Sequence, residues 1–342
     1  MKTRALSLCA AASLLLVPCL AADDIPRTPS GKPDFSGNYD VSFLTPLERD
    51  PRFGDRMYLT EEEAEAIANG TAAANARDLE VRESNRGVIA GLSDEGFRGV
   101  GGYNLFWLDR GTSAFKVDGK YRTSVLTDPP NGRLPPRTEA GQARFDTLPP
   151  FSYENTGTAW WLDNGDDPYD GPESLTLGNR CVFHQGSTMP IGPRAYNNLK
   201  TIVQTDTHVV ILIEWMHWAR IVRLGGEHPP EDYRSYAGDS VGRWEGDTLV
   251  IETRNLLGDW GFHREGAHVV ERLSFQDENH LFYEYTVNDP EFTAPYSGSL
   301  PWPRTDDRLY EFACQEGNYS MGNTLRGARY LEQQYDQHHG RQ

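Results

Sequence analysis

Alternating apolar and polar residues dominate the second half of the chain, in short runs separated by turns rich in Gly, Asp and Asn. Such runs predict β-strands, because successive side chains of a strand point to opposite faces. The predicted strands are 200–205, 208–215, 218–224, 241–244, 247–254, 268–276, 280–288 and 308–314. Short strands with frequent turns are typical of a meander that closes on itself. The expected fold class is mainly β: a lipocalin-like antiparallel, up-and-down β-barrel with peripheral N-terminal and C-terminal helices.

The clearest hairpin lies in GDSVGRWEGDTLVIET, residues 238–253, where Glu245-Gly246-Asp247 predict a tight turn between two strands. A barrel of about eight strands is just wide enough to hold one small ligand. Polar side chains that face its interior are therefore where a functional site is expected.

The first half is less regular. Residues 34–41 predict a strand, and Gly37-Asn38-Tyr39 resembles the Gly-x-Trp opening of lipocalins, with Tyr in place of Trp. A capping box at 60–63 begins a helix that Gly70 is expected to end. Further helices are predicted at 71–85, 138–145 and 319–334, and short strands at 103–108, 113–117 and 121–127. The predicted domains are a signal peptide (1–22), a β-rich region with helical insertions (23–180), the barrel (181–318) and a C-terminal helix and tail (319–342). Residues 35–180 form either a second small barrel or part of a single larger one.

The first 22 residues are typical of an export signal, with a basic start, an apolar run at 5–17 and a small-x-small cleavage site. The expected localisation is periplasmic or secreted. In an oxidising compartment, the pair that remains after cleavage, Cys181 and Cys314, favours a structural disulfide over a metal ligand or a nucleophile.

The net charge of −17 repels nucleic acid and anionic membranes, so neither is an expected partner. No segment after the signal is apolar enough to insert into a membrane. The chain contains no dinucleotide-binding fingerprint and no phosphate loop, so no cofactor is expected. The expected partner is a small-molecule substrate or ligand, and the sequence leaves the oligomeric state open.

The hairpin sequence, followed by HVVERLSF, YEYTVNDPEFTAPY and YEFACQEGNY, resembles a large family of secreted bacterial proteins. GGYNLFWLDRGT and RTSVLTDPPNGRLPP in the first half fit the same family. The resemblance covers nearly the whole chain after the signal. It implies a secreted, lipocalin-like protein and does not imply a reaction.

The strongest candidate site is the stretch 209–220, where an apolar strand ends in ionisable and aromatic residues. Glu214, His217 and Arg220 would surround a hydrophobic slot at a barrel mouth, with Trp215 and Trp218 stacking on a flat ligand. The alternative is that Glu214 and Arg220 pair across a hairpin and both tryptophans belong to the core.

A second candidate is the strand that begins at His268. Alternation places His268 and Arg272 on one face and Glu271 on the other, while Tyr283 and Tyr285 share a face of the next strand. If His268 faces inward, it would meet His217 and Glu214 as an acid/base set. The same three residues could bind zinc or iron, but no metal-ligand spacing supports this, and no metal is predicted.

Weaker candidates lie in loops. Arg194, Tyr196 and Asn197 precede a strand and would bind a ligand carboxylate or hydroxyl, and Glu316 would lie at a rim tethered by Cys314. Gly238-Asp239-Ser240 resembles a serine esterase block but lies in a β-meander, which argues against that enzyme class. The carboxylates at 163–171 do not follow the order of a calcium loop.

The leading hypothesis is a non-redox enzyme, an isomerase, lyase or hydrolase, that performs cofactor-free acid/base chemistry on a small, partly hydrophobic or aromatic substrate. Glu214 or His217 would be the base and His268 or Tyr283 the acid, while Arg220 or Arg272 would stabilise negative charge. The alternatives are a non-catalytic lipocalin-like carrier and a structural envelope protein.

Overall fold

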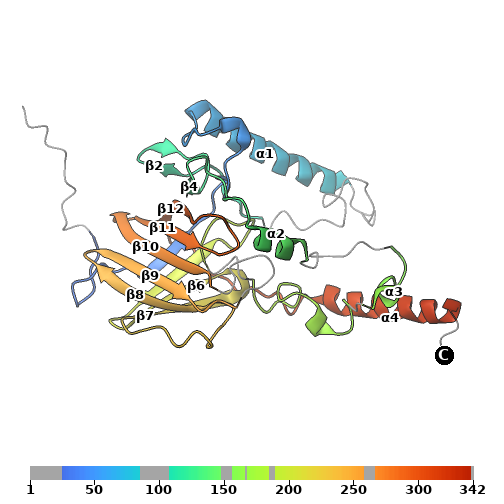
Figure 1. The fold of residues 1–342 in the computed structure, drawn as a ribbon. Coiled ribbons are helices and arrows are strands. Elements are labelled where there is room, and N and C mark those ends of the chain that lie inside the picture. The colour runs from blue at the N-terminus through green and yellow to red at the C-terminus, as the bar shows by residue number, and fades with distance from the viewer. Residues whose placement is uncertain are drawn as a thin grey trace, which may run out of the picture.

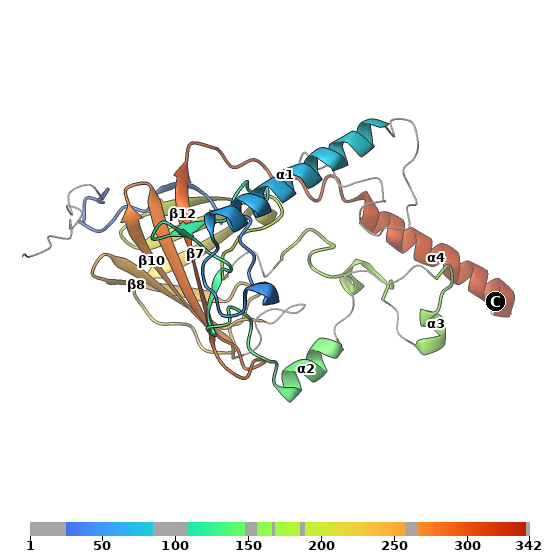
Figure 2. The ribbon, with the colours of Figure 1, turned by 90° about the horizontal axis from the view of Figure 1, so that it is seen from above.

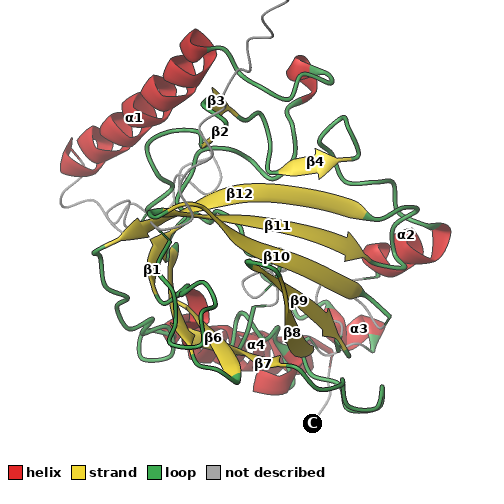
Figure 3. Ribbon diagram, turned by 90° about the vertical axis from the view of Figure 1, so that its left-hand side faces the viewer, coloured by secondary structure: helices red, strands yellow, loops and turns green. Residues whose placement is uncertain are grey.

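The computed structural model describes residues 25–84, 108–147, 156–165, 168–184, 189–257 and 266–339. Its centre is a closed, nine-stranded β-barrel (Figures 1 and 3). The barrel strands are β1 (Gly37–Asp40), β5 (Leu199–Gln204), β6 (His208–Ile213), β7 (Trp218–Leu224), β8 (Asp239–Glu245), β9 (Thr248–Arg254), β10 (His268–Asp277), β11 (His280–Asn288) and β12 (Tyr296–Thr305). The predicted barrel is confirmed. The predicted signal peptide lies outside the described residues.

One strand pair departs from the predicted up-and-down order. β7 and β8 run parallel, with Val222 opposite Ser240 and Leu224 opposite Gly242, whereas all the other pairs around the barrel are antiparallel. The segment 225–238 between them is long enough to return to the end of the barrel at which β7 began. A parallel pair needs such a crossover, because a tight turn joins only antiparallel strands. The barrel is therefore mixed.

The last barrel strand is β12, and the prediction of a strand at 308–314 is wrong. Residues 308–314 contain no strand, and the side chain of Tyr310 is exposed. The sequence of β12 contains Pro301 and Pro303, which argue against an inner strand because proline lacks an N–H donor. Both prolines lie between the pairing of β12 with β4 (Leu126–Asp128) at 297–298 and its pairing with β1 at 304–305. On its other edge β12 pairs with β11 through this stretch, so the prolines are tolerated where one edge of the strand has no partner.

The N-terminal strand closes the barrel. β1 pairs with β5 on one side and with β12 on the other, and Asn38 lies opposite both Thr201 and Thr305. One barrel is present in the described part of the chain, and the described segments between β1 and β5 add no strand to its ring. These segments include β4 and the small hairpin of β2 (Lys116–Val117) and β3 (Lys120–Tyr121). The predicted strand at 103–108 lies, except for its last residue, outside the described residues.

The helices lie outside the barrel (Figure 2). α1 is one continuous helix, Glu61–Ser84, so the prediction that Gly70 ends a first helix is wrong. Glycine costs about 1 kcal/mol within a helix, and the alanine-rich residues 72–76 favour its continuation. α2 (Glu139–Asp146) begins at its predicted cap, Thr138, whose hydroxyl accepts the N–H of Gly141. α3 (Trp161–Asn164) packs against α4 (Tyr319–His339) through Trp161 and Ala328.

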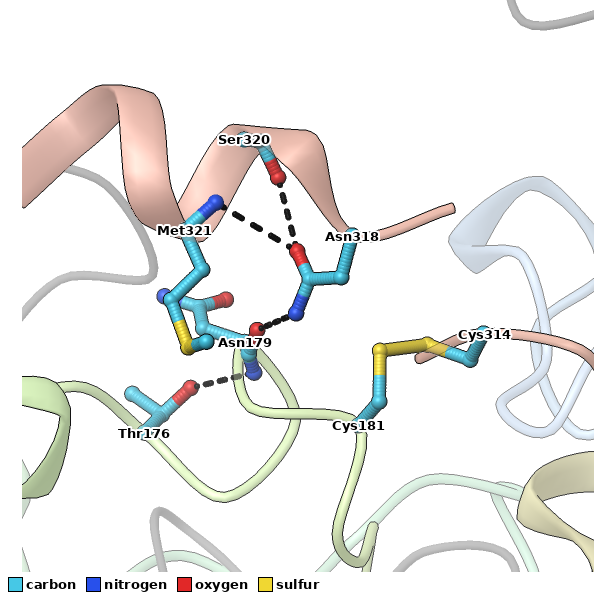
Figure 4. Close-up of a disulfide and its surroundings, with 7 residues drawn as sticks. All are labelled: Thr176, Asn179, Cys181, Cys314, Asn318, Ser320 and Met321. Carbon is cyan, nitrogen blue, oxygen red and sulfur yellow. Dashed lines mark hydrogen bonds between the residues drawn. A yellow bond between two sulfur atoms is a disulfide. The ribbon is translucent and has the colours of Figure 1, made fainter. Parts of the chain in front are cut away.

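A disulfide joins the loop before β5 to the segment before α4, as the sequence predicts (Figure 4). Cys181 and Cys314 are separated by 133 residues. Next to the disulfide, the Asn318 amide donates to the backbone oxygen of Asn179 at 2.8 Å and accepts the N–H of Met321 at 3.4 Å. The start of α4 is therefore attached to the 176–181 loop by covalent and polar contacts together.

The barrel interior differs at its two ends. At the end that contains the Gly246 turn, Phe35 packs against Trp244 and Phe275 at centroid distances of 5.5 and 5.2 Å. Toward the opposite end, where β6 turns into β7, charged and polar side chains are buried among apolar ones. The residues 189–198 contact this second end, which is where the candidate site lies.

Candidate functional site

Five neighbouring strands, β7 to β11, each contribute one buried polar side chain to the interior. These residues, which we call the polar belt, are Arg220, Ser240, Thr253, Glu271 and Tyr283. The Arg220 guanidinium forms an ion pair with Glu271 and donates to Thr253 at 2.8 Å and to Ser240 at 3.2 Å. The Ser240 and Thr253 hydroxyls lie 2.9 Å apart, and Tyr283 donates to Glu271 at 2.6 Å. The members of the polar belt are therefore hydrogen-bond partners of one another.

The belt is also bonded to the loop that contacts this end. The Tyr283 hydroxyl accepts the backbone N–H of Ile191 at 3.0 Å. Burial, together with the neighbouring Glu271 carboxylate, raises the pKa of Tyr283 well above that of a free phenol. Tyr283 thus remains protonated and connects the barrel wall to the loop 189–198.

A buried amine lies nearby on β5. Lys200 is 2% exposed, and its Nζ donates to the backbone oxygens of Asn197 at 3.3 Å and Leu199 at 3.2 Å. Burial lowers the pKa of Lys200 to about 7; the negative charge of Glu214 opposes this shift, and the positive charge of Arg194 adds to it. A neutral amine has two N–H groups and one lone pair. The two carbonyls match the two N–H groups, which leaves the lone pair able to accept a proton.

Glu214 follows β6 directly and is 5% exposed. Its backbone N–H donates to the Leu199 oxygen, and its carboxylate accepts the Leu199 N–H, both at 3.2 Å. The carboxylate therefore lies at a fixed place beside the strand that carries Lys200. The residues that follow, Trp215–His217, form a single tight turn in which Met216 and His217 have φ values of 59° and 52°.

Aromatic side chains gather around this turn in a group that we call the Trp215 cluster. Trp215 stacks on Tyr196 at 4.4 Å and on Phe312 at 5.9 Å, and the His184 ring meets it edge-on at 5.9 Å. The guanidinium carbon of Arg194 lies 6.0 Å from the Trp215 ring centroid. Burial and the charge of Arg194 lower the pKa of His184. The predicted binding residues Arg194, Tyr196 and Trp215 thus lie together.

Other predicted site residues have different surroundings. Trp218 packs edge-on against Phe183 at a centroid distance of 4.8 Å and is not part of the Trp215 cluster. Asn197 supplies a backbone oxygen to Lys200. Tyr285 is buried beside Tyr283, and burial raises its pKa. Glu316 is exposed in the segment before α4.

The acid/base set that was expected around His268 is not assembled. His268 and Arg272 lie on the outer face of β10, where the His268 ring lies 3.0 Å from the Glu252 carboxylate and Arg272 forms an ion pair with Glu245 at 2.9 Å. His217 is exposed. The inward residue of this part of β10 is Glu271, between the buried Val269 and Leu273. The contact of His268 with His217 was expected only if His268 faced inward, and it faces outward.

Sequence reasoning missed Lys200, Glu271, His184 and Phe312. The alternation pattern of the sequence contained a signal for Lys200 and Glu271. Glu271 alternates with Val269 and Leu273, and Lys200 shares a face with Ile202, so each charged residue lies on an apolar face of its strand. No comparable signal places His184 or Phe312, because both belong to irregular segments.

No family model, curated protein or solved structure matches this chain. Among the described residues, no group of three or more His, Cys, Asp or Glu side chains could hold a metal ion. No described helix combines the length and the apolar character that a membrane span requires. The functional argument therefore depends on Lys200 with its neighbour Glu214 and on the Trp215 cluster.

Proposed function

We propose that this protein is a periplasmic or secreted enzyme that performs cofactor-free acid/base chemistry on a small, partly hydrophobic or aromatic molecule. The substrate binds at the Trp215 end of the barrel, and Lys200 and Glu214 move the proton. The disulfide between Cys181 and Cys314 supports an oxidising compartment, and the resemblance to secreted bacterial proteins agrees with it.

The observation that carries this proposal is the buried Lys200 amine, beside the Glu214 carboxylate and at the barrel end that the Trp215 cluster borders. A base is most effective when its pKa lies near the working pH, and burial brings the pKa of Lys200 to about 7. When the amine accepts a proton, the Glu214 charge stabilises the ammonium. Isomerisation, elimination and hydrolysis all use such a step.

The test is exchange of a carbon-bound proton with solvent. Benzyl methyl ketone is incubated with the protein in D₂O, and the loss of its α-proton signals is followed by NMR. The wild type should accelerate exchange above the buffer rate, with a rise through pH 7 to a plateau. Lys200→Met should abolish the acceleration, while Lys116→Met, which alters an exposed lysine, should retain it. Equal exchange by the wild type and Lys200→Met would refute the proposal.

A non-catalytic carrier is the second candidate, and the polar belt favours it. Arg220, Glu271 and Tyr283 are buried and bonded to one another, so they have little capacity left for a substrate. In a carrier, these groups would only fix the shape of the interior. Binding of the ketone without any exchange, detected by a change in tryptophan fluorescence, would identify the carrier.

A further inference from the structure

Among the described residues, the Arg194 guanidinium has no acceptor. In the part of the chain that the structure describes, it forms neither a hydrogen bond nor an ion pair through its side chain. The chain contains 50 Asp and Glu residues against 33 Lys and Arg, so carboxylates are plentiful. Two other enclosed arginines have one, since Arg220 pairs with Glu271 and Arg144 pairs with Glu291, whereas the buried Arg122 has none among the described residues. Arg194 differs from Arg122 in lying beside the Trp215 ring at the barrel end where Lys200 is buried.

The backbone N–H and C=O groups of Arg194 are both held by hydrogen bonds. The buried Asn198 side chain accepts the Arg194 N–H at 2.7 Å and donates to the Arg194 oxygen at 3.0 Å. The same amide donates to the Asp109 oxygen at 2.5 Å, so the loop is attached to a second segment. A pre-ordered cation loses less conformational entropy when an anion binds.

The surroundings of Arg194 combine an aromatic wall with solvent access. Its guanidinium carbon lies 6.0 Å from the centroid of the Trp215 ring, and that ring is nearly parallel to those of Tyr196 and Phe312, at interplanar angles of 21° and 22°. All four residues are half-buried, so part of each surface reaches solvent. A guanidinium fork matches the two oxygens of a carboxylate, and an aromatic wall accepts a flat apolar group.

The charges at this end favour an anion. Burial lowers the pKa of Arg194 to about 10, so the guanidinium remains charged at neutral pH. Its charge contributes to lowering the pKa of both His184 and Lys200. A bound carboxylate would offset this positive field and would raise the pKa of Lys200 again.

We propose that Arg194 and the Trp215 cluster form a subsite for a carboxylate attached to a flat aromatic or conjugated group. The inference rests on the proposed function, because it names the substrate class of the same barrel end. The substrate is then an aromatic or conjugated carboxylic acid. Arg194 binds its carboxylate, Tyr196 and Trp215 contact its ring, and Lys200 lies on the barrel side of the site.

The test compares 2-naphthoate with 2-naphthamide, which has a similar shape and no charge. Affinities are measured by isothermal titration calorimetry for the wild type, for Arg194→Gln and for Arg308→Gln, a control at an exposed arginine. The wild type and the control should bind naphthoate at least tenfold more tightly than the amide. Arg194→Gln should lose this preference and keep its affinity for the amide within about twofold.

Two results would overturn the inference. The first is equal binding of both compounds by the wild type, or a preference that persists in Arg194→Gln. The second is binding of neither compound at millimolar concentration. The proposed function is tested separately, because the ketone in the exchange assay has no carboxylate. Exchange without a naphthoate preference would refute only the anion subsite, and a naphthoate preference without exchange would refute only the acid/base function.

Discussion

Arg220 on β7 and Glu271 on β10 form an ion pair inside the barrel, although two strands lie between them in the sheet. Their side chains are 2% and 0% exposed. The pair is possible because the closed sheet turns both side chains toward a common axis. In an open, flat sheet, inward residues from strands so far apart would not meet.

Removing one partner of the Arg220–Glu271 ion pair should destabilise the protein. Glu271→Gln leaves the Arg220 charge buried without its counter-charge, so the free energy of unfolding should fall by about 3–5 kcal/mol. The double change Arg220→Met with Glu271→Leu removes both charges and should cost less than Glu271→Gln alone. Urea unfolding of the three proteins measures both effects. An unchanged midpoint for Glu271→Gln would contradict the stabilising role of the pair.

Tyr283→Phe should lower the free energy of unfolding, because the Tyr283 hydroxyl is hydrogen-bonded inside the barrel. It removes the hydroxyl that joins Glu271 to the Ile191 N–H, and a lost buried hydrogen bond of this kind costs about 1–3 kcal/mol. Tyr285→Phe is the matched control, since the Tyr285 hydroxyl is buried and has no hydrogen bond partner among the described residues. Tyr285→Phe should be neutral or slightly stabilising. Amide exchange at Ile191 should accelerate only in Tyr283→Phe.

Lys200 should make the stability depend on pH above neutrality. Its pKa is about 7 in the folded protein and near 10.5 in an unfolded chain. Between these values the unfolded state binds more protons, so the free energy of unfolding rises with pH. Urea midpoints of the wild type should therefore increase from pH 7 to 9 relative to those of Lys200→Met. A parallel pH profile in the two proteins would show that the amine is not buried.

The outer residues of β10 should be dispensable for activity. His268 and Arg272 face away from the barrel interior, and the ion pair of Arg272 with Glu245 is exposed, so solvent screens it. His268→Ala and Arg272→Ala should therefore leave ketone exchange within about twofold of the wild-type rate. A tenfold loss in either variant would place the chemistry on the outer face of the sheet.

The disulfide should stabilise both the fold and the Trp215 cluster. Closing a loop of 133 residues contributes about 5 kcal/mol in the chain-entropy model. The double change Cys181→Ala with Cys314→Ala should lower the melting temperature and weaken naphthoate binding, because Phe312 lies two residues from Cys314. Unchanged naphthoate affinity would show that Phe312 is held by other contacts.

Much of the barrel could be predicted from local pattern. The turn at Gly246 occurs where the sequence indicates it, and Gly246 has a φ of 63° that favours glycine. Eight of the predicted strands overlap barrel strands of the structure, because alternation and turn chemistry are properties of neighbouring residues. The strand with Pro301 and Pro303 was missed, since the gap on one edge of this strand lies between its pairings with β4 and β1, which are distant in sequence.

By itself, the sequence determined which side chains share a face: His268 with Arg272, Tyr283 with Tyr285. Only the tertiary structure decided which face is inside. A period of two relates residues along one strand and does not say on which side of the sheet the core forms. The barrel turns Glu271 and Lys200 inward and leaves His268 outside, because the curvature and register of the whole sheet, set by contacts distant in sequence, select the buried face.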